Sequence, residues 1–368
     1  MKPVLVPITA LLLMFTCVNV LIAAPNSDSA QPDDKYWHSL TVTDSSLSSF
    51  VNAMIVYRGE LIVAGGFASA GAVPLNSIAR WDGTGWRPLG KGMDAPISCL
   101  AEYKGDLIAA GEFKAAGGMP ASRIARWNGS SWKPFESGIA GQSPSTWACV
   151  SAMTIYKGEL IVGGHFSKAG GNNIQSLACW NGSSWHSLPY QLSGDVKALG
   201  TFHDQLVVAG DISEPSSGTP VLRWDGQQGW TLMGNGAPDD APVVFGSYQQ
   251  EFIMGGKFSE LGTRTANGIA VLHDTTWHAL GDGLGHNVWA LAEYNGELIA
   301  AGADGAIGRW DGLTWETLGS GANGDINSLL VFNGKLIAGG GFTEVGAAAV
   351  KFVAIWDKPS TSISSEDR

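Results

Sequence analysis

Polar and aromatic side chains recur just before a set of short apolar segments, and their chemistry suits the binding of a cation or a sugar. Carboxylates arranged around an opening can hold a cation or accept hydrogen bonds from sugar hydroxyls, and a Trp ring offers a flat face for stacking. These residues are Asp94, Trp147, Asp195, Asp239, Asp240, His286, Asn287 and Asp325. We predict a binding site among them. The alternative, in which the Asp residues cap turns and keep the surface soluble, stays open.

The same residues do not assign a catalytic group. The adjacent carboxylates of Asp239 and Asp240 could act as general acid and base only if burial raised the pKa of one of them. The 7 histidines lack the close spacing of metal-binding motifs, so we predict no transition-metal site and no cofactor, although a cation among the carboxylates stays open. Calcium-loop, Gly-x-Ser-x-Gly and phosphate-loop patterns are absent.

The element that must position these side chains is a repeat. Residues 57–67, Tyr-Arg-Gly-Glu-Leu-Ile-Val-Ala-Gly-Gly-Phe, are echoed at 103–113 and 156–166, with weaker copies that begin at Phe202, Tyr248, Tyr294 and Phe332. Each copy is followed by a strand such as residues 78–81 and, in all but the last copy, by a Trp-x-x-Leu element or a close variant. A period of roughly 45 residues with short strands is typical of β-propellers.

Each repeat supplies four strands, so we predict an all-β fold, a seven-bladed β-propeller of four-stranded antiparallel blades over residues 36–357. The first Trp-x-x-Leu element, residues 37–40, precedes every other strand, whereas the last repeat ends near Asp357 without one. The N-terminal segment is therefore expected to close the ring as the outer strand of the last blade, which removes unpaired strand edges.

Glycine recurs at the end of the second strand of every repeat. Either a side chain there would block a neighbouring backbone, or the position needs a positive φ. The positions are 65, 111, 164, 210, 256, 302 and 340.

These repeats resemble kelch-type units of the galactose-oxidase-like propellers, in strands that end in a small-Gly pair, in a hairpin Tyr and in a later Trp. They are more similar still to the Trp-Asn-Gly-Ser-Ser-Trp repeats, seen here at 127–132 and 180–185, of exported bacterial propellers and of the fungal cortical polarity marker. The resemblance covers roughly residues 36–357 and implies a fold, because the matching residues are turn and packing positions. In five repeats the second glycine is replaced, by Glu112, His165, Asp211, Lys257 and Ala303.

The chain ends indicate export. Residues 1–24 combine Lys2, an apolar run and small residues, which is typical of a secretory signal peptide, with an uncleaved membrane anchor as the alternative. We expect a secreted, extracellular or periplasmic protein, with no membrane span in the mature chain. Residues 25–35 are expected to be a disordered linker, and residues 358–368 a disordered tail.

The net charge and the cysteine content limit which partners and which disulfide bonds we expect. A net charge of −11 without a basic stripe argues against nucleic acid. Once Cys17 leaves with the signal peptide, Cys99, Cys149 and Cys179 remain, an odd number that we interpret as buried small side chains. A disulfide between Cys149 and Cys179 stays open, and we expect a monomer.

The predicted function follows from the loops. The connections on one face of a propeller built this way are short and uniform, whereas those on the other face vary in length, and variable loops on a rigid scaffold usually carry binding. We predict a non-catalytic scaffold that binds a protein or a surface glycan through this face. A carbohydrate-active enzyme with acidic residues at the channel mouth is the alternative, and a structural module of an envelope assembly is a third possibility.

Overall fold

The structure is a computed structural model, and it describes residues 31–40, 45–143, 147–212, 220–226 and 229–358. The only helical elements in these ranges are the short 3-10 helices η1 (Asp34–Tyr36) and η2 (Ala303–Gly305), so the prediction of an all-β chain is confirmed. None of the helices described is long and apolar enough to cross a membrane. The predicted signal peptide, residues 1–24, lies outside the described residues.

The first sheet shows how one repeat folds. Its strands are β2 (Val51–Tyr57), β3 (Glu60–Gly65), β6 (Ile78–Trp81) and β7 (Trp86–Pro88), paired antiparallel in this order. The turn between β2 and β3 places Arg58 and Gly59 at φ values of 51° and 79°. Positive φ at both central residues is the type I′ geometry, whose twist matches that of the flanking strands.

Among the described residues, 4-stranded sheets with this order occur seven times, and we number them 1 to 7 from the N-terminus of β2 onwards. Sheet 2 contains β8 (Ile97–Tyr103), β9 (Asp106–Gly111), β12 (Ile124–Trp127) and β13 (Trp132–Pro134). Sheet 3 contains β15 (Cys149–Tyr156), β16 (Glu159–His165), β19 (Leu177–Trp180) and β20 (Trp185–His186). Sheet 4 contains β21 (Gly194–Phe202), β22 (Gln205–Ile212), β23 (Val221–Trp224) and β24 (Trp230–Leu232).

Sheets 5 to 7 follow the same plan. Sheet 5 contains β25 (Pro242–Tyr248), β26 (Glu251–Gly256), β29 (Ile269–His273) and β30 (Thr276–Ala279). Sheet 6 contains β31 (Val288–Tyr294), β32 (Glu297–Gly302), β33 (Ile307–Trp310) and β34 (Trp315–Thr317). Sheet 7 contains β35 (Ile326–Phe332), β36 (Lys335–Gly340), β37 (Val353–Trp356) and β1 (Trp37–Ser39).

Two-residue strands pair within the longer loops. They are β4 (Ser69–Ala70), β5 (Val73–Pro74), β10 (Ala115–Ala116), β11 (Met119–Pro120), β14 (Ile139–Ala140), β17 (Lys168–Ala169), β18 (Asn172–Asn173), β27 (Glu260–Leu261) and β28 (Arg264–Thr265).

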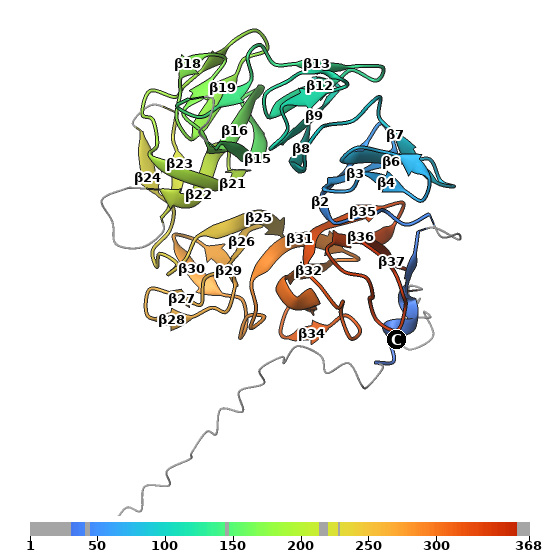
Figure 1. The fold of residues 1–368 in the computed structure, drawn as a ribbon. Coiled ribbons are helices and arrows are strands. Elements are labelled where there is room, and N and C mark those ends of the chain that lie inside the picture. Colours follow the sequence, from blue (N-terminus) through green and yellow to red (C-terminus); the bar gives the residue numbers. More distant parts are fainter. Residues whose placement is uncertain (1–30, 41–44, 144–146, 213–219, 227–228, 359–368) are drawn as a thin grey trace, which may run out of the picture.

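The sheets follow one another around a common centre, in chain order, with the first strand of each sheet nearest the centre (Figure 1). Apolar side chains of neighbouring sheets pack against each other, as Tyr57 and Ile62 of sheet 1 do with Ile97 and Leu107 of sheet 2. Because each sheet is covered on both faces, its second strand is buried over nearly its whole length, as in β3.

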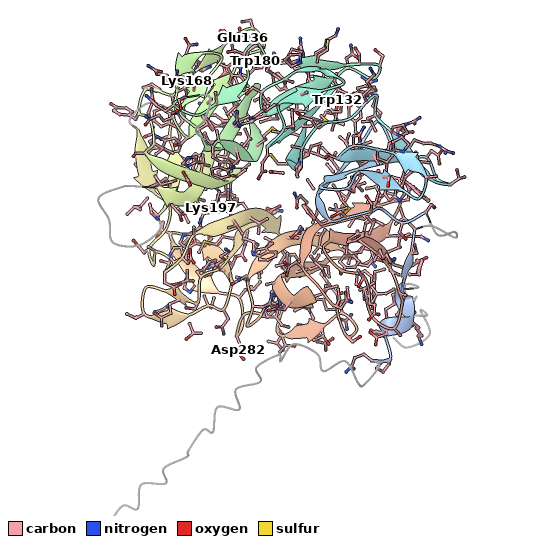
Figure 2. The ribbon with its side chains drawn as sticks, viewed as in Figure 1. Trp132, Glu136, Lys168, Trp180, Lys197 and Asp282 are labelled. Atoms are coloured by element: carbon pink, nitrogen blue, oxygen red, sulfur yellow. The ribbon has the colours of Figure 1, made fainter. Side chains whose placement is uncertain are left out.

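A β-bulge interrupts the pairing near the start of every first strand, for example between Val51 and Ala53 and between Val196 and Ala198. A bulge re-aims the side chain of the extra residue. In sheet 4 that residue is Lys197, and Figure 2 shows it toward the centre of the molecule, whereas Lys168 lies farther out.

The recurring glycine is required by a close approach. A Cβ atom on Gly340 would collide with the carbonyl oxygen of Asp325, and one on Gly302 would collide with that of Asn287. Neither residue has the positive φ that strains other side chains. Of the two explanations for this column, crowding by the neighbouring strand therefore holds at these positions.

The N-terminal segment lies beside the C-terminal strand. β1 pairs antiparallel with β37, with Trp37 opposite Trp356, and the two rings lie 5.1 Å apart. The side chain of Asp34 is buried and accepts hydrogen bonds from the N–H and Oγ of Ser320 at 2.6 and 2.9 Å. Asp34, which belongs to the predicted linker of residues 25–35, makes these contacts, and residues 25–30 of that linker lie outside the described residues.

Candidate functional site

An exposed aromatic ring marks the junction of sheets 3 and 4. Trp147 lies just before β15 and has 57% of its surface exposed, although large apolar residues are usually covered. Its ring lies 5.1 Å from the imidazole of His165, at the end of β16, and is tilted by 31°. The Nδ1 atom of His165 lies 2.6 Å from Oδ1 of Asp195 in β21, so three side chains from two sheets form one cluster.

A hollow of about 280 Å³ lies beside this cluster, and we call it the Trp147 cleft. Its lining combines apolar surface with polar side chains and includes Gln142, Trp147, His165, Ser167, Gln175, Ser176 and Asp195. The Oγ atom of Ser167 is buried and has no hydrogen-bond partner among the described residues.

A second hollow, of about 450 Å³, adjoins the first and shares Gly141 and Gln142 with it. We call it the Arg123 pocket, and its lining includes Lys114, Ser122, Arg123, Gln142, Ser143 and Lys168. Figure 2 shows Lys168 in the outer part of sheet 3's region. No ion pair involves Lys114, Arg123 or Lys168 within the part of the chain that the structure describes.

Arg123 carries a buried charge in this pocket. Only 8% of its surface is exposed, and its guanidinium donates to the carbonyl oxygens of Ala148 and Ile139 at 2.7 and 3.1 Å and to Ser122 Oγ at 3.1 Å. These partners are neutral. A buried guanidinium with neutral partners still favours a nearby anion, because its charge is otherwise uncompensated in a medium of low dielectric constant.

The predicted site residues separate into two groups. Trp147 and Asp195 come together in the Trp147 cleft. Asp94 and Asp239 instead bind the loop of their own sheet: Asp94 accepts from the N–H groups of Lys114 and Ala115, and Asp239 from those of Ser259 and Glu260. For these two residues the geometry matches the turn-capping alternative.

The other predicted residues also keep to local contacts. Asp240 accepts from the N–H of Ala241 at 2.6 Å, and Asp325 from that of Asp304 at 3.2 Å. The carbonyl oxygen of Asn287 accepts from the N–H of Ala303 at 3.0 Å. Burial lowers the pKa of His286, against smaller raising effects of its hydrogen bond to Asn287 and of Asp304.

The pKa of Asp239 shifts in the direction opposite to the one that a general acid at this position would need. Burial tends to raise the pKa of Asp239, but hydrogen bonds from Ser259 Oγ and from the N–H groups of Glu260 and Ser259 outweigh it. The pKa of Asp239 therefore lies below its ordinary value, so this carboxyl is not a proton donor near neutral pH.

We predict that Asp239→Asn lowers the free energy of unfolding by about 1 kcal/mol at pH 7, the scale of the hydrogen bonds it weakens. Since the pKa of Asp239 is lower in the folded state, its stabilising effect is present above the unfolded value and is lost as pH falls through the folded one. Urea unfolding at pH 7 and pH 3 measures this. Asp240→Asn is the control, because Asp240 accepts from one N–H group only. An equal effect of Asp239→Asn at both pH values would contradict the assignment.

His165, Arg123, Gln142 and Gln175 were not singled out as site residues from the sequence. His165 carried one usable signal, since it replaces the second glycine of its repeat. Arg123 carried none, because it precedes the regular strand β12 and its burial depends on the loop that contains β14. The cysteines Cys99, Cys149 and Cys179 are free thiols, so a disulfide between Cys149 and Cys179 is not formed.

Comparison with known proteins supports the fold. No protein-family model and no curated protein matches the chain. Among solved structures, RRP9 WD40 repeats share 16% identity and a TM-score of 0.56 over 90% of this chain and 98% of that one. YCF48 bound to D1 peptide shares 15% sequence identity and a TM-score of 0.56, over 92% of this chain and 98% of that one. The extracellular domain of the hybrid two component system BT4673 from B. thetaiotaomicron shares 12% sequence identity and a TM-score of 0.58, over 88% of this chain and 40% of that one. At these identities the likeness establishes a β-propeller fold alone.

Proposed function

We propose that this protein is an exported, non-catalytic propeller that binds an acidic glycan across the Trp147 cleft and the Arg123 pocket. One observation carries the proposal: an exposed Trp ring and a buried guanidinium without a carboxylate partner line two hollows that share Gly141 and Gln142. The first suits a sugar ring and the second suits an anionic substituent.

The Trp147 cleft has the mixed lining that sugars need. A sugar presents an apolar C–H face, which stacks on an aromatic ring, and hydroxyls, which need both donors and acceptors. The cleft supplies the ring of Trp147 and the amides of Gln142 and Gln175. Asp195 and His165 complete it with an acceptor and a ring nitrogen.

The Arg123 pocket suggests that the sugar is acidic. Lys114, Arg123 and Lys168 line it, although the chain as a whole has a net charge of −11. A guanidinium matches the two oxygens of a carboxylate or a sulfate, and lysines add charge without demanding a fixed geometry. An acidic glycan would thus place its ring on Trp147 and its anionic group beside Arg123.

The proposal extends to the architecture and location of the protein. We propose that the seven sheets are the blades of one closed ring, with β1 as the outer strand of the last blade. Pairing of β1 with β37, and a shared apolar cluster of Val51 and Leu61 with Ile337 and Val353, support this closure. Export rests on the apolar run within residues 1–24.

Isothermal titration with a panel of defined oligosaccharides tests the binding proposal. We expect oligomers of hexuronic acid or sulfated sugars to bind, neutral oligomers of the same length to bind at least about tenfold more weakly, and the affinity for acidic sugars to fall as salt rises from 50 to 500 mM, as the Debye length shortens toward roughly 4 Å. Equal affinity for neutral and acidic sugars would refute the role of the Arg123 pocket. No binding of any sugar, together with capture of an envelope protein, would refute the glycan proposal in favour of a protein partner.

A further inference from the structure

Three side chains of sheet 3 present metal-binding atoms to one another, away from the site described above. Glu159 begins β16, Cys179 lies in β19 and His186 ends β20, and one donor atom of each lies within 4.8 Å of the other two. The Nε2 atom of His186 lies 2.9 Å from Oε2 of Glu159. The three residues are separated by more residues than the ligands of short metal-binding motifs, so a search for such spacing predicted no metal site here.

The same cross-strand position holds a cation in other sheets. The acidic residue that begins the second strand pairs with an arginine of the third strand as Glu60 with Arg80, Asp106 with Arg126 and Glu297 with Arg309. In sheet 3 the arginine position is Cys179. Glu159 therefore lacks the arginine partner that Glu60, Asp106 and Glu297 have, and its ion-pair partner is His186, just as Glu251 of sheet 5 pairs with His273.

The imidazole of His186 is oriented for coordination. Its Nδ1 lies 3.3 Å from the carbonyl oxygen of Ser187, and its Nε2 faces the carboxylate of Glu159. In the tautomer with its N–H on Nδ1, the lone pair of Nε2 is free to coordinate a metal beside the carboxylate. Metal-bound histidines commonly have this arrangement, with the second ring nitrogen donating to a carbonyl.

We propose that Glu159, Cys179 and His186 form a zinc(II) site that takes the place of the paired arginine found in sheets 1, 2 and 6. A carboxylate oxygen, an imidazole nitrogen and a thiolate sulfur are zinc ligands, and tetrahedral coordination holds ligand atoms roughly 3.5 Å apart, which small side-chain rotations can reach here. Three protein ligands leave a fourth position for water. The thiol of Cys179 loses its proton to solvent as the sulfur–zinc bond forms, so charge and atoms balance.

The surroundings leave a path for a metal ion. Cys179 is fully buried, whereas the side chains of His186 and Glu159 are 40% and 33% exposed. The metal can therefore enter from solvent past the two exposed ligands.

Cobalt(II) titration of the full chain without an affinity tag tests the proposal, because a cobalt–thiolate bond produces a charge-transfer absorption band. We expect one cobalt per chain, the band, and its loss when zinc displaces cobalt. Cys179→Ser should abolish the band, and His186→Gln and Glu159→Gln should each weaken zinc binding at least about tenfold. The matched controls are His278→Gln, since His278 also follows an outer-strand Trp but lies opposite Val271, and Cys149→Ser.

Each result decides the assignment. Absence of the band in the unchanged chain, or its persistence in Cys179→Ser, overturns the proposal, as does weakening of zinc binding by His278→Gln as strong as that by His186→Gln. If the buried substitution Cys179→Ser unfolds the chain, the two partly exposed substitutions decide the question, with melting of the metal-free variants confirming that they fold. This site is independent of glycan binding, so titration of an acidic oligosaccharide is expected to be unchanged in His186→Gln.

Discussion

Trp37→Ala is expected to lower the free energy of unfolding by about 3–5 kcal/mol, the usual cost of removing a buried Trp ring. The ring is 2% exposed, packs on Trp356, and donates from Nε1 to the carbonyl oxygen of Leu318 at 3.2 Å. It therefore fastens the N-terminal segment to both sheet 6 and sheet 7. Loss of the ring leaves a cavity and an unpaired carbonyl where β1 pairs with β37.

Urea unfolding measures this change, and His38→Ala is its control because His38 is exposed on the same strand and opposite Ile355. We expect the control to stay within about 0.5 kcal/mol of the unchanged chain. Equal small effects of both substitutions would show that the β1–β37 pairing contributes little, and the proposed closure by the N-terminal strand would then fail.

Trp147→Ala is expected to raise the Kd for an acidic oligosaccharide about tenfold or more, equivalent to about 1.4 kcal/mol. The expected loss combines the apolar contact of the ring with the sugar face and the support that the ring gives to His165. Because the ring is already exposed, its removal should change the free energy of unfolding by less than about 0.5 kcal/mol.

Isothermal titration gives the affinities, with Trp147→Phe retaining a stacking face and a larger share of the affinity. Leu313→Ala is the matched control, since Leu313 is 79% exposed in the turn between β33 and β34 and belongs to neither hollow. An affinity unchanged in Trp147→Ala would remove the Trp147 cleft from the binding site. An equal loss in Leu313→Ala would point to a general effect on the protein rather than to stacking.

The elements of the fold were predictable because they depend on nearby residues. Tyr57, Arg58 and Gly59 form their turn from local backbone preferences, and the Asn-Gly pairs at 128 and 181 favour the outer hairpins in the same way. The sequence predicted that Trp37 lies in the outer strand of the last sheet, because the N-terminal segment has one strand too many and the last repeat has one too few. Pairing of Trp37 with Trp356 matches that expectation.

The candidate site was only partly predictable. Trp147 and Asp195 were expected near an opening, but Asp94 and Asp239 have the same residue type as Asp195 and bind backbone N–H groups of their own loops. Residue type and repeat position do not distinguish a carboxylate that caps a loop from one that faces a neighbouring sheet. The difference depends on the path of each loop, which varies from repeat to repeat.

The repeat pattern alone accounts for the strands, their antiparallel order and the recurrence of the glycines, because turns and side-chain alternation recur in every unit over short range. Tertiary structure alone brought Arg123 under the loop of β14, set His165 against Trp147 and Asp195, and gathered Glu159, Cys179 and His186 on one sheet. Those contacts join residues from different strands or sheets. Their geometry follows from how sheets pack and loops cross, which no local pattern encodes.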